Sequence, residues 1–264
     1  MGSRWTGMFS SFLFLAVPVL GVATFAVAPA FNIWLPKDVS SHGATIDSLF
    51  MFILILTGIV FVITEGLLFW FLWKYDAAKA TGPASYVHGN HTLEVMWTVI
   101  PAGVLLFLAI YQMNTWANVK MRRPAMAPTL EVVGRQFEWR LRYPGRDGTL
   151  GTPDDLFLVN DLHVPVDEDI LIQLKSMDVL HSFFLPNLRV KQDAVPGMKI
   201  PVWFKATQTG QFDIVCAELC GWGHYKMAGQ ITIESRKDFN AWLESMYAKQ
   251  EATQPEPAAV ALAQ

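Results

Sequence analysis

The first half of the chain carries three apolar stretches, each long enough to cross a bilayer as a helix. Met8–Phe31 and Val95–Trp116 hold no charged residue, and Ile46–Trp73 holds only Asp47 and Glu65. About 20 apolar helical residues span the ~30 Å hydrocarbon core of a bilayer. The whole chain is 52% hydrophobic and only 16% charged, with a mean hydropathy of +0.30. These values indicate a membrane protein that also has a soluble part.

The first stretch fits two descriptions. It follows Arg4, and "APA" before Phe31 resembles a signal-peptidase site, as in a secretory signal. It is long for the apolar region of a signal, so we favour a retained helix. We therefore expect residues 1–43 to hold a signal or extra transmembrane helix and a linker, and residues 44–123 to form a two-helix transmembrane hairpin.

From about Thr129 the pattern changes to short segments in which apolar and polar residues alternate. This period-two pattern predicts half-buried strands, and turn-forming residues separate them. Many short strands at this spacing are typical of a small β-sandwich or barrel. The segments are 135–143, 169–175, 197–205, 210–218 and 229–235.

A single amphipathic helix is expected to close this domain. Ser235 and Asp238 resemble a capping box, and the apolar residues that follow recur at helical spacing: Phe239, Trp242, Leu243, Met246 and Tyr247. The domain is thus expected at 124–249. The remaining residues, 250–264, have no usable pattern and are expected to be disordered.

The Asp-rich and Gly-rich segment 145–155 raises the question of a calcium loop. Asp147, Asp154 and Asp155 are suitable oxygen ligands, but the segment lacks the spacing and the closing Glu of an EF-hand. We prefer an ordinary connecting loop.

The segment "CAELCGWGHYKM" gathers metal-binding side chains between two predicted strands. Cys216 and Cys220 are the only cysteines, and His224 and Met227 follow them closely. Two buried idle thiols or a disulfide would leave the histidine and the thioether without a role.

A net charge of −3 gives no indication of nucleic-acid binding.

Copper suits this ligand set better than zinc does. Methionine is not a usual zinc ligand, whereas copper electron-transfer sites combine His, Cys and a weak Met on an all-β scaffold. His181, directly after a predicted strand, could supply the second imidazole. Two thiolates directed at one point could bridge two copper ions.

The segment resembles the Cys-x-Glu-x-Cys-Gly-x-x-His-x-x-Met signature of the binuclear copper site, CuA, of cytochrome c oxidase subunit II. "TLEVMWTVIP" (92–101) and "DVLHSFFLPNLRVKQDAVPG" (178–197) resemble further segments of that family, in the same order. The resemblance covers roughly residues 44–249 and implies a membrane hairpin followed by a cupredoxin-like domain.

The resemblance also implies a ligand set. Cys216 and Cys220 would bridge the coppers, His181 and Met227 would complete one ion, and His224 with the backbone carbonyl of Glu218 would complete the other. The side chain of Glu218 would reach a magnesium or manganese ion at the boundary with subunit I.

Two further residues receive roles by resemblance. Glu94 matches a glutamate near the mouth of a proton-uptake path into subunit I. The family often has "QWYW" where this chain has "QFEW", so Phe137 stands where a tryptophan receives the electron. Trp139 and Trp222 are then the candidates for this role, although each could simply be a packing residue.

The implied function is electron transfer from cytochrome c to haem in subunit I, where oxygen is reduced to water and protons are pumped. The expected partners are subunit I, other oxidase subunits, cytochrome c and membrane lipid. The implied location is the inner membrane, with the copper domain on the periplasmic or intermembrane-space side. Lys120, Arg122 and Arg123 mildly favour the opposite orientation.

Three other kinds of protein share part of this pattern. A quinol-oxidase subunit II would lack the copper ligands that this chain retains. A copper carrier would have no need of Glu94 and Glu218. Nitrous oxide reductase shares the ligand signature but is soluble, whereas this chain has a predicted membrane hairpin.

Overall fold

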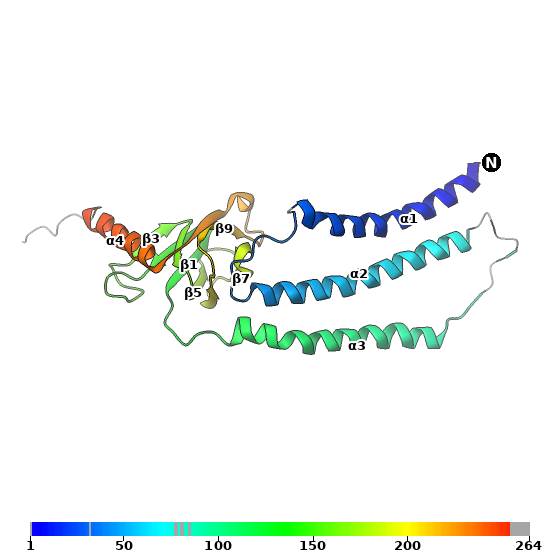
Figure 1. Cartoon of the computed structure of the whole chain (residues 1–264), viewed down its shortest axis with the longest axis horizontal. Coiled ribbons are helices and arrows are strands. Elements are labelled where there is room, and N and C mark those ends of the chain that lie inside the picture. Colours follow the sequence, from blue (N-terminus) through cyan, green and yellow to red (C-terminus); the bar gives the residue numbers. More distant parts are fainter. Residues whose placement is uncertain (1, 32, 77–78, 80–81, 84–85, 254–264) are drawn as a thin grey trace, which may run out of the picture. The chain divides into compact units, whose positions relative to one another are not determined.

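The computed structural model describes residues 2–31, 33–76, 79, 82–83 and 86–253 (Figure 1). The chain forms two compact units. One comprises Met1–Pro36 and Asp47–Asn114, and the other comprises Lys37–Ile46 and Thr115–Gln264.

The first unit is helical. Its helices are α1 (Gly2–Val27), the 3-10 turn η1 (Ala28–Phe31), α2 (Gly43–Lys74) and α3 (His91–Trp116). Among the described residues, three helices are long and apolar enough to cross a membrane by length and composition, which confirms the expected apolar helices: Phe14–Phe31, Gly43–Lys74 and His91–Met121. Helix α3 begins earlier than its apolar stretch because the side-chain oxygen of Asn90 accepts a hydrogen bond from Leu93 N at 3.2 Å, an N-cap.

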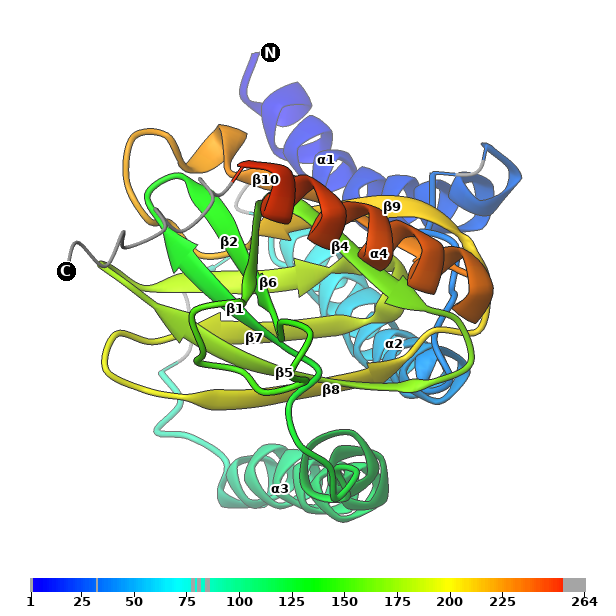
Figure 2. The ribbon, with the colours of Figure 1, turned by 90° about the vertical axis from the view of Figure 1, so that its left-hand side faces the viewer.

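The second unit is a β-sandwich followed by one helix, as predicted. One sheet has the strand order β3-β2-β1-β5-β8 and the other has the order β4-β10-β9-β6-β7 (Figure 2). The strands are β1 (Leu130–Arg135), β2 (Glu138–Tyr143), β3 (Leu156–Val159), β4 (Asp161–Pro165), β5 (Asp169–Ser176), β6 (His181–Leu185), β7 (Val190–Ala194), β8 (Ile200–Lys205), β9 (Gly210–Cys216) and β10 (Ala228–Glu234). A π-helical turn, η3 (Ala117–Met121), continues α3, and two 3-10 turns lie between strands: η4 (Pro186–Leu188) and η5 (His224–Lys226).

Alternating burial produces the strands that the sequence predicts. On β2, Trp139, Leu141 and Tyr143 point into the core, while the residues between them are half-buried. Strands β8, β9 and β10 follow the same rule, whereas β5 also buries Leu171, between Ile170 and Ile172. The strands that the pattern does not predict are β1, β3, β4, β6 and β7. On β6, Ser182 and Phe183 are both fully buried, so no period-two signal exists there.

Helix α4 (Arg236–Thr253) closes the sandwich and lies over β4 (Figure 2). Its predicted cap is confirmed, because Oγ of Ser235 accepts a hydrogen bond from Asp238 N at 3.1 Å. Trp242 stacks on the ring of His163, with 4.0 Å between ring centroids. The helix extends to Thr253, into the range expected to be disordered, and the expected tail beyond it lies outside the described residues.

The loop at 145–155 uses its carboxylates to hold itself together. The buried carboxylate of Asp155 forms an ion pair with Arg142 and accepts a hydrogen bond from Gly151 N at 2.8 Å. Thr152 Oγ1 donates to Asp154 at 2.7 Å.

Candidate metal centre

Two neighbouring strands of one sheet bring the sequence-predicted ligands together. His181 is the first residue of β6, and Cys216 is the last residue of β9. These strands pair antiparallel, with Phe183 opposite Cys216. The pairing therefore places His181 beside the start of the loop that carries Cys220, although 35 residues separate His181 from Cys216 in the chain.

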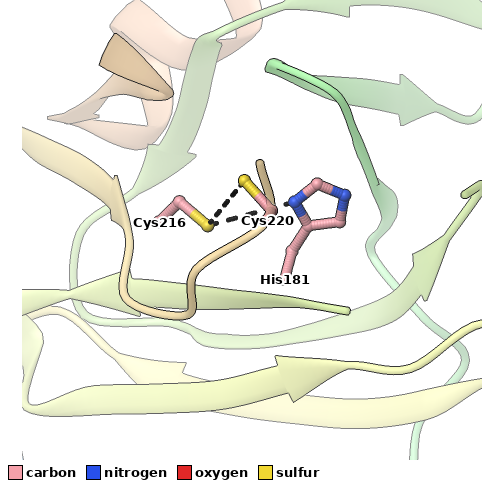
Figure 3. Close-up of side chains that lie close together, drawn as sticks. All are labelled: His181, Cys216 and Cys220. Atoms are coloured by element: carbon pink, nitrogen blue, oxygen red, sulfur yellow. Dashed lines mark hydrogen bonds between the residues drawn. The ribbon is translucent and has the colours of Figure 1, made fainter. Parts of the chain in front are cut away.

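The three side chains point toward one another (Figure 3). Sγ of Cys216 lies 3.9 Å from Nδ1 of His181 and 3.9 Å from Sγ of Cys220. All three residues are buried, and their ligand atoms lie within 4.8 Å of one another. This cluster can hold a soft metal ion away from bulk water.

The rest of the loop adds ligands to the same cluster. Nδ1 of His224 and Sδ of Met227 each lie 3.7 Å from Sγ of Cys220. The carbonyl oxygen of Glu218 lies 3.2 Å from Sγ of Cys216. At the base of the loop, Cys216 N donates a hydrogen bond to Met227 O at 3.1 Å, so the loop leaves and rejoins the sheet at paired positions.

These spacings suit ligands that share a metal. With metal–sulfur bonds of about 2.3 Å and tetrahedral angles, two ligands of one ion lie roughly 3.7 Å apart. The described spacings of 3.7–3.9 Å between sulfur and neighbouring ligand atoms match this value. Two thiols, two imidazoles and a thioether form a soft donor set that favours copper.

The two thiols differ in acidity. Burial opposes ionisation of Cys216, but its hydrogen bonds with His181 and with neighbouring backbone groups outweigh this and lower its pKa to about 6. Burial, together with the negative charge of Cys216, raises the pKa of Cys220 to about 11. In the metal-free chain the pair thus shares one negative charge at neutral pH.

Asp178 contacts the histidine of the cluster, a role that the sequence does not reveal. Its Oδ1 lies 2.8 Å from Nε2 of His181, and its Oδ2 accepts a hydrogen bond from Gln136 N at 2.7 Å. Burial alone would raise the pKa of this carboxyl, but the bonds from Gln136, His181 and Val179 hold it below its ordinary value. For His181, burial lowers the pKa, yet the bonds to Cys216 and Asp178 raise it overall.

The turn between β1 and β2 also packs against the metal loop. Nε2 of Gln136 donates to the carbonyl oxygen of Cys220 at 2.5 Å. Phe137 fits against Gly221 and Gly223, where any Cβ would come within 3.2 Å and 2.5 Å of its ring, respectively. A side chain at Gly223 would overlap the Phe137 ring, so this contact requires glycine there.

Two further sequence-predicted residues, Trp139 and Glu94, contribute no ligand to the cluster. Trp139 is 0% exposed, and its ring centroid lies 6.0 Å from that of His181 in an edge-on arrangement. Because it is buried, it cannot touch a partner protein directly. Glu94 lies in the first turn of α3, in the helical unit, with its side chain 52% exposed.

Known proteins with similar sequences match both units. A family model described as "Cytochrome C oxidase subunit II, periplasmic domain" matches residues 141–235, and one described as its "transmembrane domain" matches residues 28–115. The "Alternative cytochrome c oxidase subunit 2" of Bradyrhizobium diazoefficiens is 32% identical, over 81% of this chain and 84% of the relative. The chain belongs to the cytochrome c oxidase subunit II family. As a member, it is a subunit of an oxidoreductase complex.

Two further proteins show similarity to this chain. Cytochrome c oxidase subunit 2 of Thermostichus vulcanus is 29% identical, over 79% of this chain and 77% of the relative. Among solved structures, the periplasmic domain of subunit II of cytochrome oxidase (CoxB) of Bradyrhizobium japonicum is 33% identical. The match covers 48% of this chain and 97% of the solved chain, with a TM-score of 0.43.

Proposed function

We propose that this chain accepts electrons one at a time from cytochrome c at a binuclear copper centre and passes them to haem in subunit I of the oxidase. The observation that carries the proposal is the convergence of His181, Cys216, Cys220, His224 and Met227 at spacings typical of shared metal ligands. Subunit I would perform the oxygen reduction and the proton pumping.

The proposed ligand roles follow from these contacts and from the family signature. Cys216 and Cys220 would bridge the ions, and His181 with Met227 would complete one of them. His224 and the carbonyl of Glu218 would complete the other, and the position of this carbonyl 3.2 Å from Sγ of Cys216 supports that role. The side chain of Glu218 would be available for a magnesium or manganese ion at the subunit I boundary.

Two coppers bridged by two thiolates would share a single electron, which keeps structural change on reduction small. The chain contributes a rigid frame for this chemistry. Burial excludes water from the thiolates, and Asp178 fixes one ring nitrogen of His181 so that the other faces the sulfurs. Trp139 packs against the ring of His181 and would help to hold it in place from inside the domain.

The membrane part would hold this centre near both partners. We propose that residues 44–123 form the membrane hairpin, with an additional N-terminal helix or signal in 1–43, and that 124–249 form the copper domain on the periplasmic or intermembrane-space side of the inner membrane. Glu94, in the first turn of α3, would lie near the start of a proton path into subunit I.

Electron paramagnetic resonance of the full chain loaded with copper tests the proposal. A multi-line hyperfine pattern from one electron shared by two equivalent coppers is expected. A four-line pattern would mean a single copper and would point to a carrier, whereas the absence of copper binding would reject the proposed centre. Cys220→Ser, which removes one bridge, should convert the multi-line pattern to a localised one.

A further inference from the structure

The metal loop carries one large aromatic residue that the ligand set does not use. Trp222 lies between Cys220 and His224 in the chain, and it is 78% exposed. A tryptophan is costly to expose unless it contacts a partner, because the ring offers a large apolar surface. A role for this ring in electron uptake rests on the proposed copper centre.

The loop holds Trp222 in place through Phe137. The two rings lie edge to face, with 5.4 Å between centroids. Phe137 in turn occupies the space left by the absence of side chains at Gly221 and Gly223, the residues on either side of Trp222. Nζ of Lys226 lies 4.7 Å from the centroid of the Trp222 ring on one face. These contacts fix an exposed indole instead of leaving it free to turn.

The surroundings of Trp222 are apolar and exposed. Leu219 and Tyr225, which belong to the same loop, are 75% and 81% exposed. These two residues and Trp222 alternate along the chain with Cys220, His224 and Met227, the proposed copper ligands. A protein that covers this surface therefore comes within a few covalent bonds of the metal centre. An electron carrier with an apolar rim around its cofactor suits such a surface.

Trp139 cannot supply this contact. Its side chain is completely buried against His181 and Phe183. Phe137, in the turn between β1 and β2, is itself partly covered. Of the two tryptophans considered from the sequence, only Trp222 reaches the surface at the metal loop.

We propose that Trp222, supported by Phe137, is the residue through which the donor docks and delivers its electron. One electron leaves the ferrous haem of the donor, which becomes ferric, and the copper centre is reduced by one electron. The indole itself is neither oxidised nor reduced. It provides close contact between donor and loop, and the short covalent path to Cys220 and His224 carries the electron from there.

The test uses the assembled oxidase with Trp222→Ala, Trp222→Phe and the control Phe157→Ala. Phe157 is also an exposed aromatic residue, but it lies on β3, in the opposite sheet. We expect Trp222→Ala to lower kcat/KM for cytochrome c about tenfold or more, as truncation of an aromatic hot spot does. Trp222→Phe should restore part of the rate, and Phe157→Ala should change nothing.

Two further measurements separate docking from damage to the metal centre. The paramagnetic resonance spectrum of copper and its reduction by a small-molecule reductant should be unchanged in Trp222→Ala. The affinity of the metal-free chain for oxidised cytochrome c should fall by a factor similar to that of kcat/KM. This binding measurement does not depend on turnover. A normal kcat/KM and normal binding in Trp222→Ala would overturn the proposal, as would an equal loss in Phe157→Ala. Neither result would affect the copper spectrum on which the proposed function depends.

Discussion

Nε2 of His181 lies 2.8 Å from a carboxylate oxygen of Asp178, while Nδ1 of the same ring lies 3.9 Å from Sγ of Cys216. The lowered pKa keeps Asp178 ionised at neutral pH, so its carboxylate accepts a hydrogen bond from Nε2–H of His181. Nδ1, on the side of the sulfurs, is then the ring nitrogen available to a metal. The carboxylate thus selects the tautomer that a metal requires.

Removing this carboxylate should weaken copper binding. We expect Asp178→Ala to lower copper affinity by about 10-fold to 100-fold, the usual cost of losing a group that orients a ligand. A competition titration against a copper chelator measures the change. Asp213→Asn, an exposed aspartate on β9, is the control. Equal affinities in the two variants would show that Asp178 does not orient His181.

The thiols of the metal-free chain should titrate in two separate steps. Thiolate absorbance is expected to rise near pH 6 as Cys216 ionises, and to rise again only near pH 11 with Cys220. Because the pKa of Cys216 is lowered in the folded chain, its contribution to stability is fully present above its unfolded pKa of about 9 and disappears as the pH falls to about 6. Cys216→Ser should remove the lower step. If the lower step persists in that variant, the assignment of the two thiols is incorrect.

Trp139 offers a stability test. Trp139→Ala should lower the free energy of unfolding by about 3–5 kcal/mol, because a large cavity opens in the core. Trp139→Phe should cost much less, since Nε1 of Trp139 is buried without a hydrogen-bond partner in the described structure and its loss leaves nothing unpaired. Urea unfolding of the full chain in detergent compares the two. Equal costs would mean that the indole nitrogen has a partner in solution.

The cap of α4 gives a smaller effect. Ser235→Ala should cost about 1 kcal/mol, because Asp238 N then loses the hydrogen bond that caps the first turn of the helix. Ser245→Ala, at an exposed position inside the same helix, should have almost no effect. Thermal unfolding followed by circular dichroism distinguishes them.

Glu94→Gln should separate proton uptake from electron uptake. In the assembled oxidase we expect slower oxygen consumption, while the copper resonance and the rate at which cytochrome c reduces the centre stay at wild-type values. Slower reduction of copper in this variant would contradict a role confined to protons. The placement of Glu94 on α3, in the helical unit, motivates this separation.

The parts of this molecule that could be predicted from sequence are those whose signal is local. Cys216, Cys220, His224 and Met227 lie in one loop, so their spacing alone indicates a metal site. Strands with one buried face, such as β2, show a period of two. Strand β6 does not, because Ser182 and Phe183 are both buried, and the strand that positions His181 therefore has no pattern.

Contacts between distant segments could not be predicted in this way. Asp178 belongs to a turn, and only the fold of that turn shows that its carboxylate reaches His181 and not solvent. Phe137 meets Trp222 because two loops from different sheets come together at one end of the sandwich. Neither contact leaves a trace in composition or periodicity.

The hydrogen bond from Cys216 N to Met227 O has a consequence for engineering. It closes the metal loop at its base, where Val215 pairs with Ala228 in the ladder between β9 and β10. The register of the sheet is therefore set outside the loop and does not depend on the loop's length. A shorter or longer segment with a different ligand set could therefore replace the loop between these two paired residues, and we expect the sandwich to keep its fold.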